Sequence, residues 1–411
     1  MPYSVRWSQL KILLRRLPLD TAGVFGPSTA SLPTRRVRQV ISRRFWKRYP
    51  APVRLLARPL IRLLWLIVCP IRAIHDRPRP WRTSTLLRQI WQGWRSGIRP
   101  WDQQLTSSSV FSGLSDREAA IFWANLAKLE DRRLALNKPA LSEKLAGCGL
   151  PVPTTLAILG EDQVKALRDW PWQTPVFIKL AAGSAAQGVM AVFPAAEENN
   201  LLFISDGSPL PEQVSAATAR SRLAALARNG RVLIQEFLHP AEDLRTPFPG
   251  CTPELRLTTA RYPGGPARVI AAFAKIQAPQ AYTTTSLSGA LIVPINPETG
   301  TMGLGQFLHS PGAGLTTVPW SGASLSGLHL PDYAEAVQLV EQGSTLLPSL
   351  AVIGWDVLLT DCGPVILEAN SRLSSLMINL WSDATGTPSP LPPYVEAWLK
   401  AAESGALDSP S

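Results

Sequence analysis

Cysteine and histidine are both scarce in this chain of 411 residues, with four of each. The cysteines are far apart, and none has the spacing to a histidine that a zinc site requires; they are Cys69, Cys148, Cys251 and Cys362. Disulfide frameworks and structural zinc sites depend on sets of closely spaced ligands. We therefore expect isolated core thiols and a cytoplasmic protein.

Long hydrophobic runs are missing as well. The longest run, 63–71, has nine residues, whereas a helix that spans a bilayer needs about 20. The residues after Met1 contain no apolar core of the kind found in a signal peptide. Any association with a membrane is therefore expected to be peripheral, at its inner face.

Acidic residues are almost absent from the first 100 positions. Asp20 and Asp76 stand there against 21 Lys and Arg, which gives a net charge of +19. The other 311 residues have 20 Lys and Arg against 28 Asp and Glu, a net charge of −8. Such asymmetry indicates a basic arm, suited to an anionic surface, joined to an ordinary acidic domain.

Arginines in the arm recur every four residues. Arg54, Arg58 and Arg62 would share one helical face, and Leu residues with Trp65 would fill the rest. Two interpretations fit equally well: a helix lying in the interface of an anionic membrane, or a helix docked on the catalytic domain or a partner protein. Nucleic acid is not expected as a partner, because Lys is sparse and no nucleic-acid motif is present.

Beyond the arm, the hydrophobic pattern predicts an α+β fold with mostly antiparallel strands. The predicted helices cover 116–147, 212–227 and 333–347. The predicted strands cover 176–180, 188–193, 201–204, 231–237, 254–261, 267–276, 290–295, 351–359 and 364–369. We expect three regions: a basic, largely helical region at 1–115, a catalytic domain at 116–395 and a flexible tail at 396–411.

Three polar residues interrupt the last two predicted strands. Asp356 lies in one strand, and Glu368 and Asn370 lie two residues apart at the end of the next. Because side chains alternate along a strand, Glu368 and Asn370 share a face that Asp356 can oppose. Two carboxylates and an amide oxygen suit Mg²⁺, although a structural carboxylate pair with Arg partners fits these residues about equally well.

A second pattern joins an apolar strand to a loop of small residues. Lys179 ends the strand, and the loop 180–188 follows with Ser184 inside it. A lysine and free backbone N–H groups can contact phosphates in this arrangement, yet the Gly-Lys-Ser/Thr order of a Walker A loop is missing. A hairpin with a solvated lysine explains the pattern about as well.

Two further strands complete the set. The strand edge at 235–238 can offer backbone groups to an adenine ring, and Glu242 can accept from ribose hydroxyls. Arg256 and Lys275 alternate with apolar residues on successive strands and can share one face. Two fixed cations there can balance the charge of a phosphoryl group in transfer.

The order of these four patterns resembles the ATP-grasp superfamily. The nearer resemblance is to the sugar-transfer-associated ATP-grasp domain, which is related to α-L-glutamate ligases, and it covers about residues 116–395. The segments that carry it are Asn137-Lys138-Pro139, 149–153, 295–300, 309–312, 354–357 and 363–370. The sequence departs from the family pattern at Leu180, at 182–187 and at 283–285.

The resemblance implies an ATP-grasp fold, in which two α+β lobes clasp Mg-ATP. It implies phosphate contacts for Lys138, Lys179 and Ser184. It implies an adenine site at Gln235, Glu236, Phe237 and Leu238, with Glu242 on the ribose. It also implies Arg256 and Lys275 at the transferring phosphoryl group, and Asp356, Glu368 and Asn370 on magnesium.

The implied activity is ATP-dependent ligation of a carboxylate to an amine through an acyl phosphate, in cell-surface polysaccharide chemistry. A kinase with the same fold is an alternative within the same chemistry. The alternative of another class is a catalytically silent protein that binds nucleotide or docks on a membrane.

Overall fold

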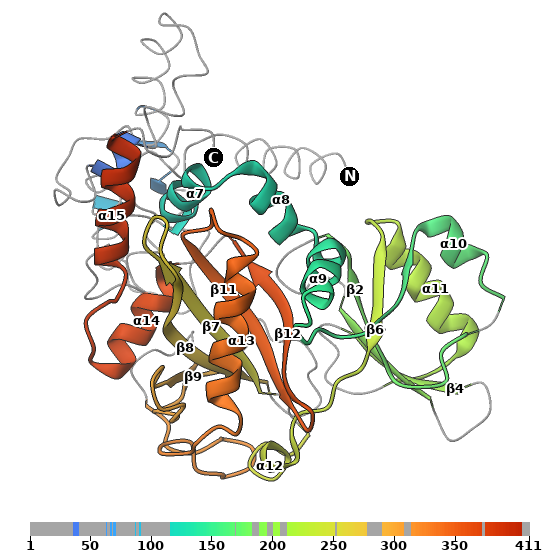
Figure 1. Cartoon of the computed structure of the whole chain (residues 1–411). Coiled ribbons are helices and arrows are strands. Elements are labelled where there is room, and N and C mark those ends of the chain that lie inside the picture. The colour runs from blue at the N-terminus through green and yellow to red at the C-terminus, as the bar shows by residue number, and fades with distance from the viewer. Residues whose placement is uncertain are drawn as a thin grey trace, which may run out of the picture. The chain divides into compact units, whose positions relative to one another are not determined.

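The computed structural model describes residues 36–40, 63, 66, 67, 69, 70, 87, 90, 91, 116–168, 170–182, 189–194, 200–205, 212–250, 253–277, 290–307, 314–371 and 375–404. The chain divides into two compact units. One unit contains residues 1–127 and 372–411, and the other contains residues 128–371. The arrangement of elements within each unit can be followed in Figure 1.

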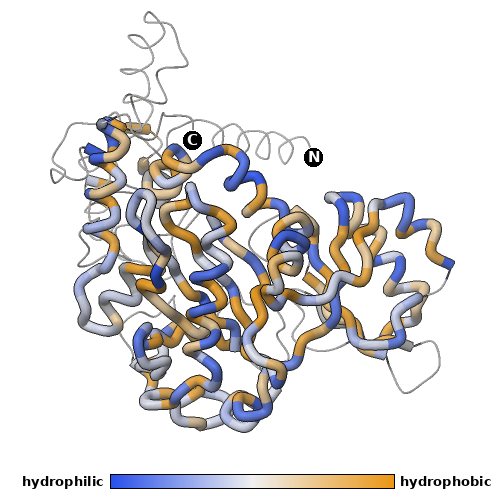
Figure 2. The backbone as a smooth tube through the Cα atoms, in the orientation of Figure 1, coloured by the Kyte–Doolittle hydropathy of each residue, from blue (hydrophilic) through white to orange (hydrophobic). Residues whose placement is uncertain are grey.

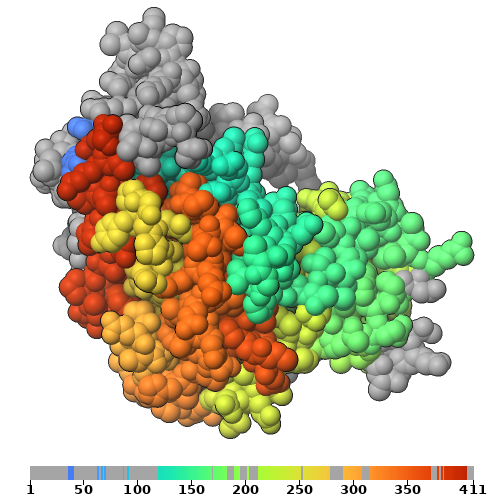
Figure 3. Space-filling model, viewed as in Figure 1, coloured from blue at the N-terminus to red at the C-terminus, as the bar shows by residue number. Residues whose placement is uncertain are grey.

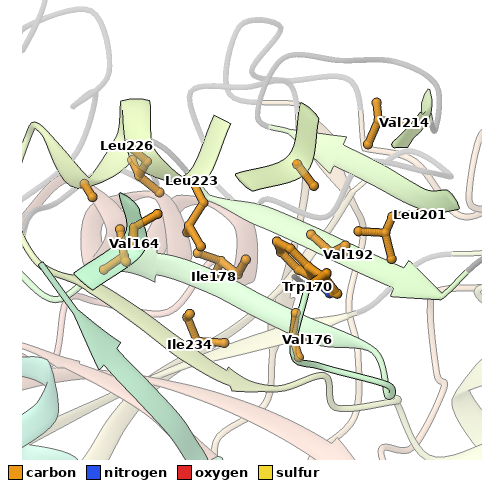
Figure 4. Packing of buried hydrophobic residues seen from close by; sticks show 13 residues of the cluster. Val164, Trp170, Val176, Ile178, Val192, Leu201, Val214, Leu223, Leu226 and Ile234 are labelled. Carbon is orange, nitrogen blue, oxygen red and sulfur yellow. The ribbon is translucent and has the colours of Figure 1, made fainter. Parts of the chain in front are cut away.

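The larger unit contains a first antiparallel sheet of six strands. In spatial order they are β1 (Thr155–Leu159), β6 (Val232–Glu236), β2 (Val176–Leu180), β3 (Met190–Pro194), β4 (Asn200–Ser205) and β5 (Glu212–Ser215). Helices α10 (Glu161–Lys165) and α11 (Ala216–Ala227) supply apolar side chains to one face of this sheet. Figure 4 shows that core, where Leu223 of α11 lies near Ile178 of the sheet and Leu226 lies near Val164 of α10.

The second sheet of this unit is also antiparallel and has six strands. In spatial order they are β10 (Gln306–Phe307), β9 (Leu291–Ile295), β8 (Ala267–Ile276), β7 (Glu254–Arg261), β11 (Val352–Thr360) and β12 (Gly363–Asn370). Helix α13 (Tyr333–Thr345) covers one face, contacting β7, β8, β11 and β12. Hydrophobic residues follow the strands of both sheets in Figure 2, while α12 (Glu242–Arg245) is mostly hydrophilic.

Trp355 shows how α13 is seated on the second sheet. Its side chain is fully buried, and its Nε1 donates to Thr259 Oγ1 at 3.1 Å and to Ser344 Oγ on α13 at 3.2 Å. Gly343 lies directly above the indole, since a Cβ placed there would be 3.2 Å from Trp355 Cη2. Trp355 therefore faces α13, and its neighbour Asp356 faces the opposite side of the sheet.

The predicted α+β class with mostly antiparallel strands is confirmed, but two of the predicted helices are not continuous helices over the predicted ranges. The segment 116–147 is three helices: α7 (Asp116–Leu126), α8 (Leu129–Leu136) and α9 (Lys138–Gly147). Asn137 separates the last two, because its side chain accepts from Ala140 N and caps α9, and Pro139 lies in the first turn of α9. The segment 212–227 begins as β5, and α11 starts only after Ser215, which caps it at Thr218 N.

The smaller unit combines segments from the N-terminal and C-terminal parts of the chain. Helix α14 (Ser375–Thr385) packs against α7, and α15 (Pro392–Glu403) binds Arg36. The Arg36 guanidinium contacts Glu396 and Glu403, each at 2.7 Å. The predicted start of the flexible tail, residue 396, therefore falls within α15. Trp398 and Leu399 of this helix are buried and hold it in place.

The described positions of the basic region 1–115 are all helical. Val37 and Val40 are buried beside Arg36, whereas five large apolar side chains are 50–64% exposed: Leu63, Leu66, Ile67, Leu87 and Trp91. The residues on which the membrane interpretation rests lie outside the described residues; they are Arg54, Arg58, Arg62 and Trp65. In the part of the chain that is described, no helix is long and apolar enough to cross a bilayer.

Candidate active site

The candidate site lies on the face of the second sheet opposite α13. In the strand register Asp356 stands opposite Arg256 on one side and Glu368 on the other. Glu254 stands opposite Lys275 in the next pair of strands. Alternation of side chains then places these charged residues on one face, as predicted for Arg256 with Lys275 and for Asp356 with Glu368.

Asp356 is the centre of this face, with only 4% of its surface exposed. Its Oδ1 accepts from Arg256 Nε at 2.6 Å and from Lys275 Nζ at 3.0 Å. Its Oδ2 accepts from Arg256 Nη2 and from Asn370 Nδ2, both at 2.9 Å. Burial alone would raise the pKa of Asp356, but Arg256 and Lys275 hold that pKa well below its usual range, so the carboxylate is ionised.

Asn370 links Asp356 to Glu368. Its Nδ2 donates to Glu368 Oε1 at 3.2 Å as well as to Asp356, which leaves its carbonyl Oδ1 as an acceptor. Glu368 Oε2 in turn pairs with Lys138 Nζ at 2.9 Å, at the first residue of α9. Lys138 therefore reaches the same site as Glu368 and Asn370, although it lies about 230 positions earlier in the sequence.

Glu254 belongs to this cluster, although it is not among the site residues predicted from the sequence. Its carboxylate contacts Lys275 Nζ, so Lys275 bridges Glu254 and Asp356. The signal available was periodicity, because Glu254 precedes Arg256 by two residues and must share its face. Lys275 is only 5% exposed, and its charge is balanced by two carboxylates.

Lys179 comes from the first sheet, on β2. Its neighbours Val176 and Ile178 belong to the core under α11, so Lys179 points to the other face, where its surface is 7% exposed. Burial, and secondarily the charge of Lys138, lower the pKa of Lys179 to about 8, while Glu368, Glu254 and Asp356 act in the opposite direction. Lys179 therefore lies within the field of the charged cluster on the second sheet.

Lys179 differs from the other cations in its partners. Lys138, Arg256 and Lys275 each pair with a carboxylate. Among the described residues, no carboxylate lies within ion-pair distance of Lys179 Nζ. The ammonium instead lies over the Phe177 ring, 5.8 Å from its centroid. A nearly buried ammonium without an anionic partner is costly, and a bound anion would relieve that cost.

The oxygen donors on β11 and β12 fit a hard divalent cation. Glu368 supplies carboxylate oxygens and Asn370 a carbonyl oxygen, held together by the Asn370 amide. Each Asp356 oxygen already accepts two hydrogen bonds, so a cation bound there would replace one of the donors. No group of three or more His, Cys, Asp or Glu side chains gathers as a metal site in the described ranges.

The proposed adenine segment lies where the chain leaves the first sheet. Gln235 is 2% exposed, and its Nε2 donates to Pro153 O at 3.4 Å. Glu236 does not point freely toward a ligand, because its Oε1 accepts from Thr154 N at 2.7 Å. Phe237 stacks edge-on against Phe193, with ring centroids 4.8 Å apart, and Leu238 is half-buried beside it. The backbone N–H groups of Glu236 and Phe237 are also in use, because they donate to Thr154 O at 3.0 Å and to Pro175 O at 3.2 Å.

Glu242, the predicted ribose contact, is exposed at the first position of α12. Its backbone N donates to Asp361 Oδ1 at 2.7 Å. Ser184, the departures at 183–187 and 283–285, and His309 in the resemblance all lie outside the described residues. The sequence-predicted residues that the structure brings together are therefore Lys138, Lys179, Arg256, Lys275, Asp356, Glu368 and Asn370.

Comparison with known proteins gives one family and several distant structures. The family model for sugar-transfer associated ATP-grasp proteins matches residues 125–387. No curated protein matches the sequence. Solved structures that are similar include an L-amino acid ligase from Bacillus licheniformis, at 12% identity and a TM-score of 0.40, over 72% of this chain and 55% of that one.

Two D-alanine-D-alanine ligases are also among the similar structures. The one from Helicobacter pylori has 14% identity and a TM-score of 0.40, over 69% of this chain and 68% of that one. The one from Coxiella burnetii has 13% identity and a TM-score of 0.38, over 68% of this chain and 61% of that one. This chain thus spans 55% and 61% of the lengths of the Bacillus and Coxiella ligases.

Proposed function

The chain belongs to the sugar-transfer-associated ATP-grasp family, and from that premise we propose that it is an ATP- and magnesium-dependent ligase that joins a carboxylate to an amine. The observation that carries the proposal is Lys179, a nearly buried ammonium with no carboxylate partner among the described residues. It faces a cluster in which the other cations that the structure describes, Lys138, Arg256 and Lys275, are each paired with a carboxylate. A triphosphate is the anion that such a set of lysines and arginine would hold.

The proposed reaction has two steps. A substrate carboxylate oxygen attacks the γ-phosphorus of ATP, the bond from that phosphorus to the bridging oxygen breaks, and ADP leaves. An amine nitrogen then attacks the acyl phosphate carbon, phosphate leaves with the electron pair of the C–O bond, and the nitrogen loses a proton. The first step is needed because a free carboxylate resists attack by an amine.

The cations have distinct tasks in this proposal. Lys138 and Lys179 bind phosphate oxygens of the nucleotide. Arg256 and Lys275 are held by Asp356 and Glu254, so they are oriented before the substrate arrives. Fixed charges of this kind stabilise a transferring phosphoryl group without reorganisation in the transition state.

Magnesium, when bound, would neutralise charge on the β- and γ-phosphates. Glu368 and Asn370 would hold it together with Asp356. Lys138, which pairs with Glu368 at 2.9 Å, would then exchange that carboxylate for a phosphate oxygen.

The substrates are proposed at the level of their class. The family name associates these domains with sugar transfer, which favours a carboxylate or amine carried by a sugar-containing molecule of the cell surface. We further propose that the basic region places the enzyme at the inner face of an anionic membrane. The exposed apolar side chains within that region support this location, since scattered large apolar groups on a +19 segment suit an anionic interface.

Thermal unfolding with and without Mg-ATP tests the nucleotide site. At about 100 times its dissociation constant, a ligand that binds only the folded protein adds about 2.7 kcal/mol to the free energy of unfolding. We therefore expect a clear rise in Tm with Mg-ATP. Folded protein whose Tm does not move with Mg-ATP would exclude the proposal.

Phosphate release with panels of amino acids and uronic acids tests the chemistry. Glu368→Gln should reduce turnover by about 100-fold or more while ATP still binds, because the lost charge matters most when charge develops on the phosphoryl group. Glu341→Gln is the matched control, since Glu341 pairs with Arg268 on the α13 side of the same sheet. Equal turnover in wild type and Glu368→Gln would refute the metal assignment.

A further inference from the structure

The short helix α12 lies in the segment that connects the two sheets. This segment leaves β6 after Glu236 and enters β7 at Glu254. Helix α12 starts after Ala241, which has no side chain able to cap it. The cap comes instead from Asp361 in the β11–β12 turn, whose Oδ1 accepts from Glu242 N at 2.7 Å across 119 positions of sequence.

Two further hydrogen bonds fix the same segment to the same hairpin, and a third lies within the segment. Arg245 Nη2 donates to the other oxygen of Asp361, and Arg245 Nε donates to Pro240 O at 2.9 Å. Ala241 N donates to Leu359 O of β11, also at 2.9 Å. We call Asp361, Arg245 and the backbone of 240–242 the α12 clasp; α12 lies beside the β11–β12 turn in Figure 1 and on the surface in Figure 3.

The clasp connects two parts of the proposed nucleotide site. One part is Glu242, to which the family resemblance gives the ribose; its side chain is exposed and has no ion pair or hydrogen bond among the described residues. The other part is the pair of strands that carry Asp356 and Glu368. Because Asp361 sits in the turn between those strands, it fixes Glu242 relative to them.

We infer that Asp361 and Arg245 are positioning residues that hold Glu242 for the ribose hydroxyls of the nucleotide. This inference rests on the proposed function. The stability of the fold gives little reason for the pair, because Asp361 and Arg245 are 52% and 46% exposed and an exposed ion pair contributes little. Their hydrogen bonds instead fix the position of the backbone at Glu242.

The test compares ATP with 2′,3′-dideoxy-ATP, which lacks both ribose hydroxyls. Dissociation constants for each, with Mg²⁺, are measured by calorimetry on the full chain. The wild type should prefer ATP. Asp361→Ala should raise the dissociation constant of ATP roughly three- to tenfold, the size of a lost cap, and should change that of the dideoxy nucleotide by less than about twofold.

A conservative variant, a control variant and a double variant test whether the effect comes from the contact of Asp361 with Glu242 N. Asp361→Asn keeps an oxygen for Glu242 N and should retain most of the preference for ATP. Glu212→Ala removes another exposed ion pair of the first sheet, 2.7 Å from Arg222, and should leave both constants unchanged. Adding Asp361→Ala to Glu242→Ala should have little further effect, because both act on one contact.

The binding constants distinguish a failure of the Asp361 role from a failure of the proposed function. Wild-type protein that is folded but binds neither nucleotide would defeat the proposed function itself. Binding of ATP with no preference over the dideoxy nucleotide would remove the ribose role of Glu242 and overturn the inference. Equal weakening of both nucleotides in Asp361→Ala would make the clasp merely structural, and unchanged constants would show that it positions nothing.

Discussion

A buried ammonium loses hydration that a folded protein must replace, and Lys179 is 7% exposed without a carboxylate partner among the described residues. Lys179→Met should therefore stabilise the ligand-free protein at pH 7, by up to about 3 kcal/mol. The same change should weaken ATP binding, because the site loses a phosphate partner. Urea unfolding measures the first effect, and nucleotide titration measures the second.

The pH dependence of the wild type follows from the same residue. Between pH 8 and the ordinary lysine pKa of 10.5, the unfolded chain carries a proton at Lys179 that the folded protein does not. The contribution of Lys179 to the free energy of unfolding therefore rises with pH across this window, and Lys179→Met should lose that rise.

Lys165→Met is the matched control for Lys179. Lys165 is 54% exposed and pairs with Glu161 on α10, so its replacement should change neither stability nor nucleotide binding by much. A loss of stability at pH 7 in Lys179→Met would mean that the ammonium has a favourable partner in the free protein, contrary to our interpretation.

For single residues, the sequence predicted which charged side chains share a face of the sheet but not which of them form ion pairs. Alternation along strands was enough to place Glu368 with Asn370 and Arg256 with Lys275. The register of β7, β11 and β12 was not predictable, so Asp356 could not be matched to Arg256 in advance. The spacing of Glu254 to Arg256 could have placed it on the same face, but its pairing with Lys275 depends on the register of β7 and β8.

Helix α13 and the strand β11 approach each other closely at Gly343 and Trp355. A Cβ on Gly343 would lie 3.2 Å from Trp355 and 3.4 Å from Ile366, so a larger side chain must displace the helix or the indole. Gly343→Val should lower the free energy of unfolding by about 1–3 kcal/mol through overpacking. Chemical denaturation of the two proteins checks this value.

Gln342→Val provides the control, since Gln342 is exposed on the same helix. It adds the same β-branched side chain without the contact, and should cost about 0.5 kcal/mol in helix propensity. Equal losses for the two variants would show that the approach of Gly343 to Trp355 does not limit packing.

Element boundaries were the weakest part of the sequence-based prediction, and the reasons are local. A run of leucines suggested one helix over 116–147, but the Asn137 cap and Pro139 start a new helix there. The pattern at 212–227 suggested a helix throughout, yet Ser215 caps α11 and the preceding residues pair with β4. The clasp between α12 and Asp361 was beyond prediction, because no pattern relates residues so far apart.

For the whole molecule, the question raised by the sequence was whether the basic region docks on the protein or on a membrane. The structure supports docking for one part, because Arg36 binds Glu396 and Glu403 while Val37 is fully buried. Farther along, Leu66 and Ile67 are at least half exposed. Docking of residues 36–40 therefore leaves apolar groups of the same region open to another surface.

These exposed groups predict a mode of binding with two components. Basic side chains near an anionic surface contribute about 1 kcal/mol each and are screened by salt over about 8–10 Å. Insertion of Leu66 and Trp91 depends on apolar area and is less sensitive to salt. Binding to anionic vesicles should therefore weaken at high salt without vanishing, while neutral vesicles should bind poorly.

Co-sedimentation with vesicles of phosphatidylserine and phosphatidylcholine, against phosphatidylcholine alone, tests this at low and high salt. Leu66→Glu with Trp91→Glu should remove most of the binding that survives high salt, because the inserted groups become charged. Leu156→Glu, at a 42% exposed position of β1, is the control and should bind like wild type. These point variants keep the Arg36 contacts that deletion of residues 1–100 would destroy. Equal sedimentation with both vesicle types, or binding unaffected by the double variant, would leave the exposed side chains to a protein partner instead.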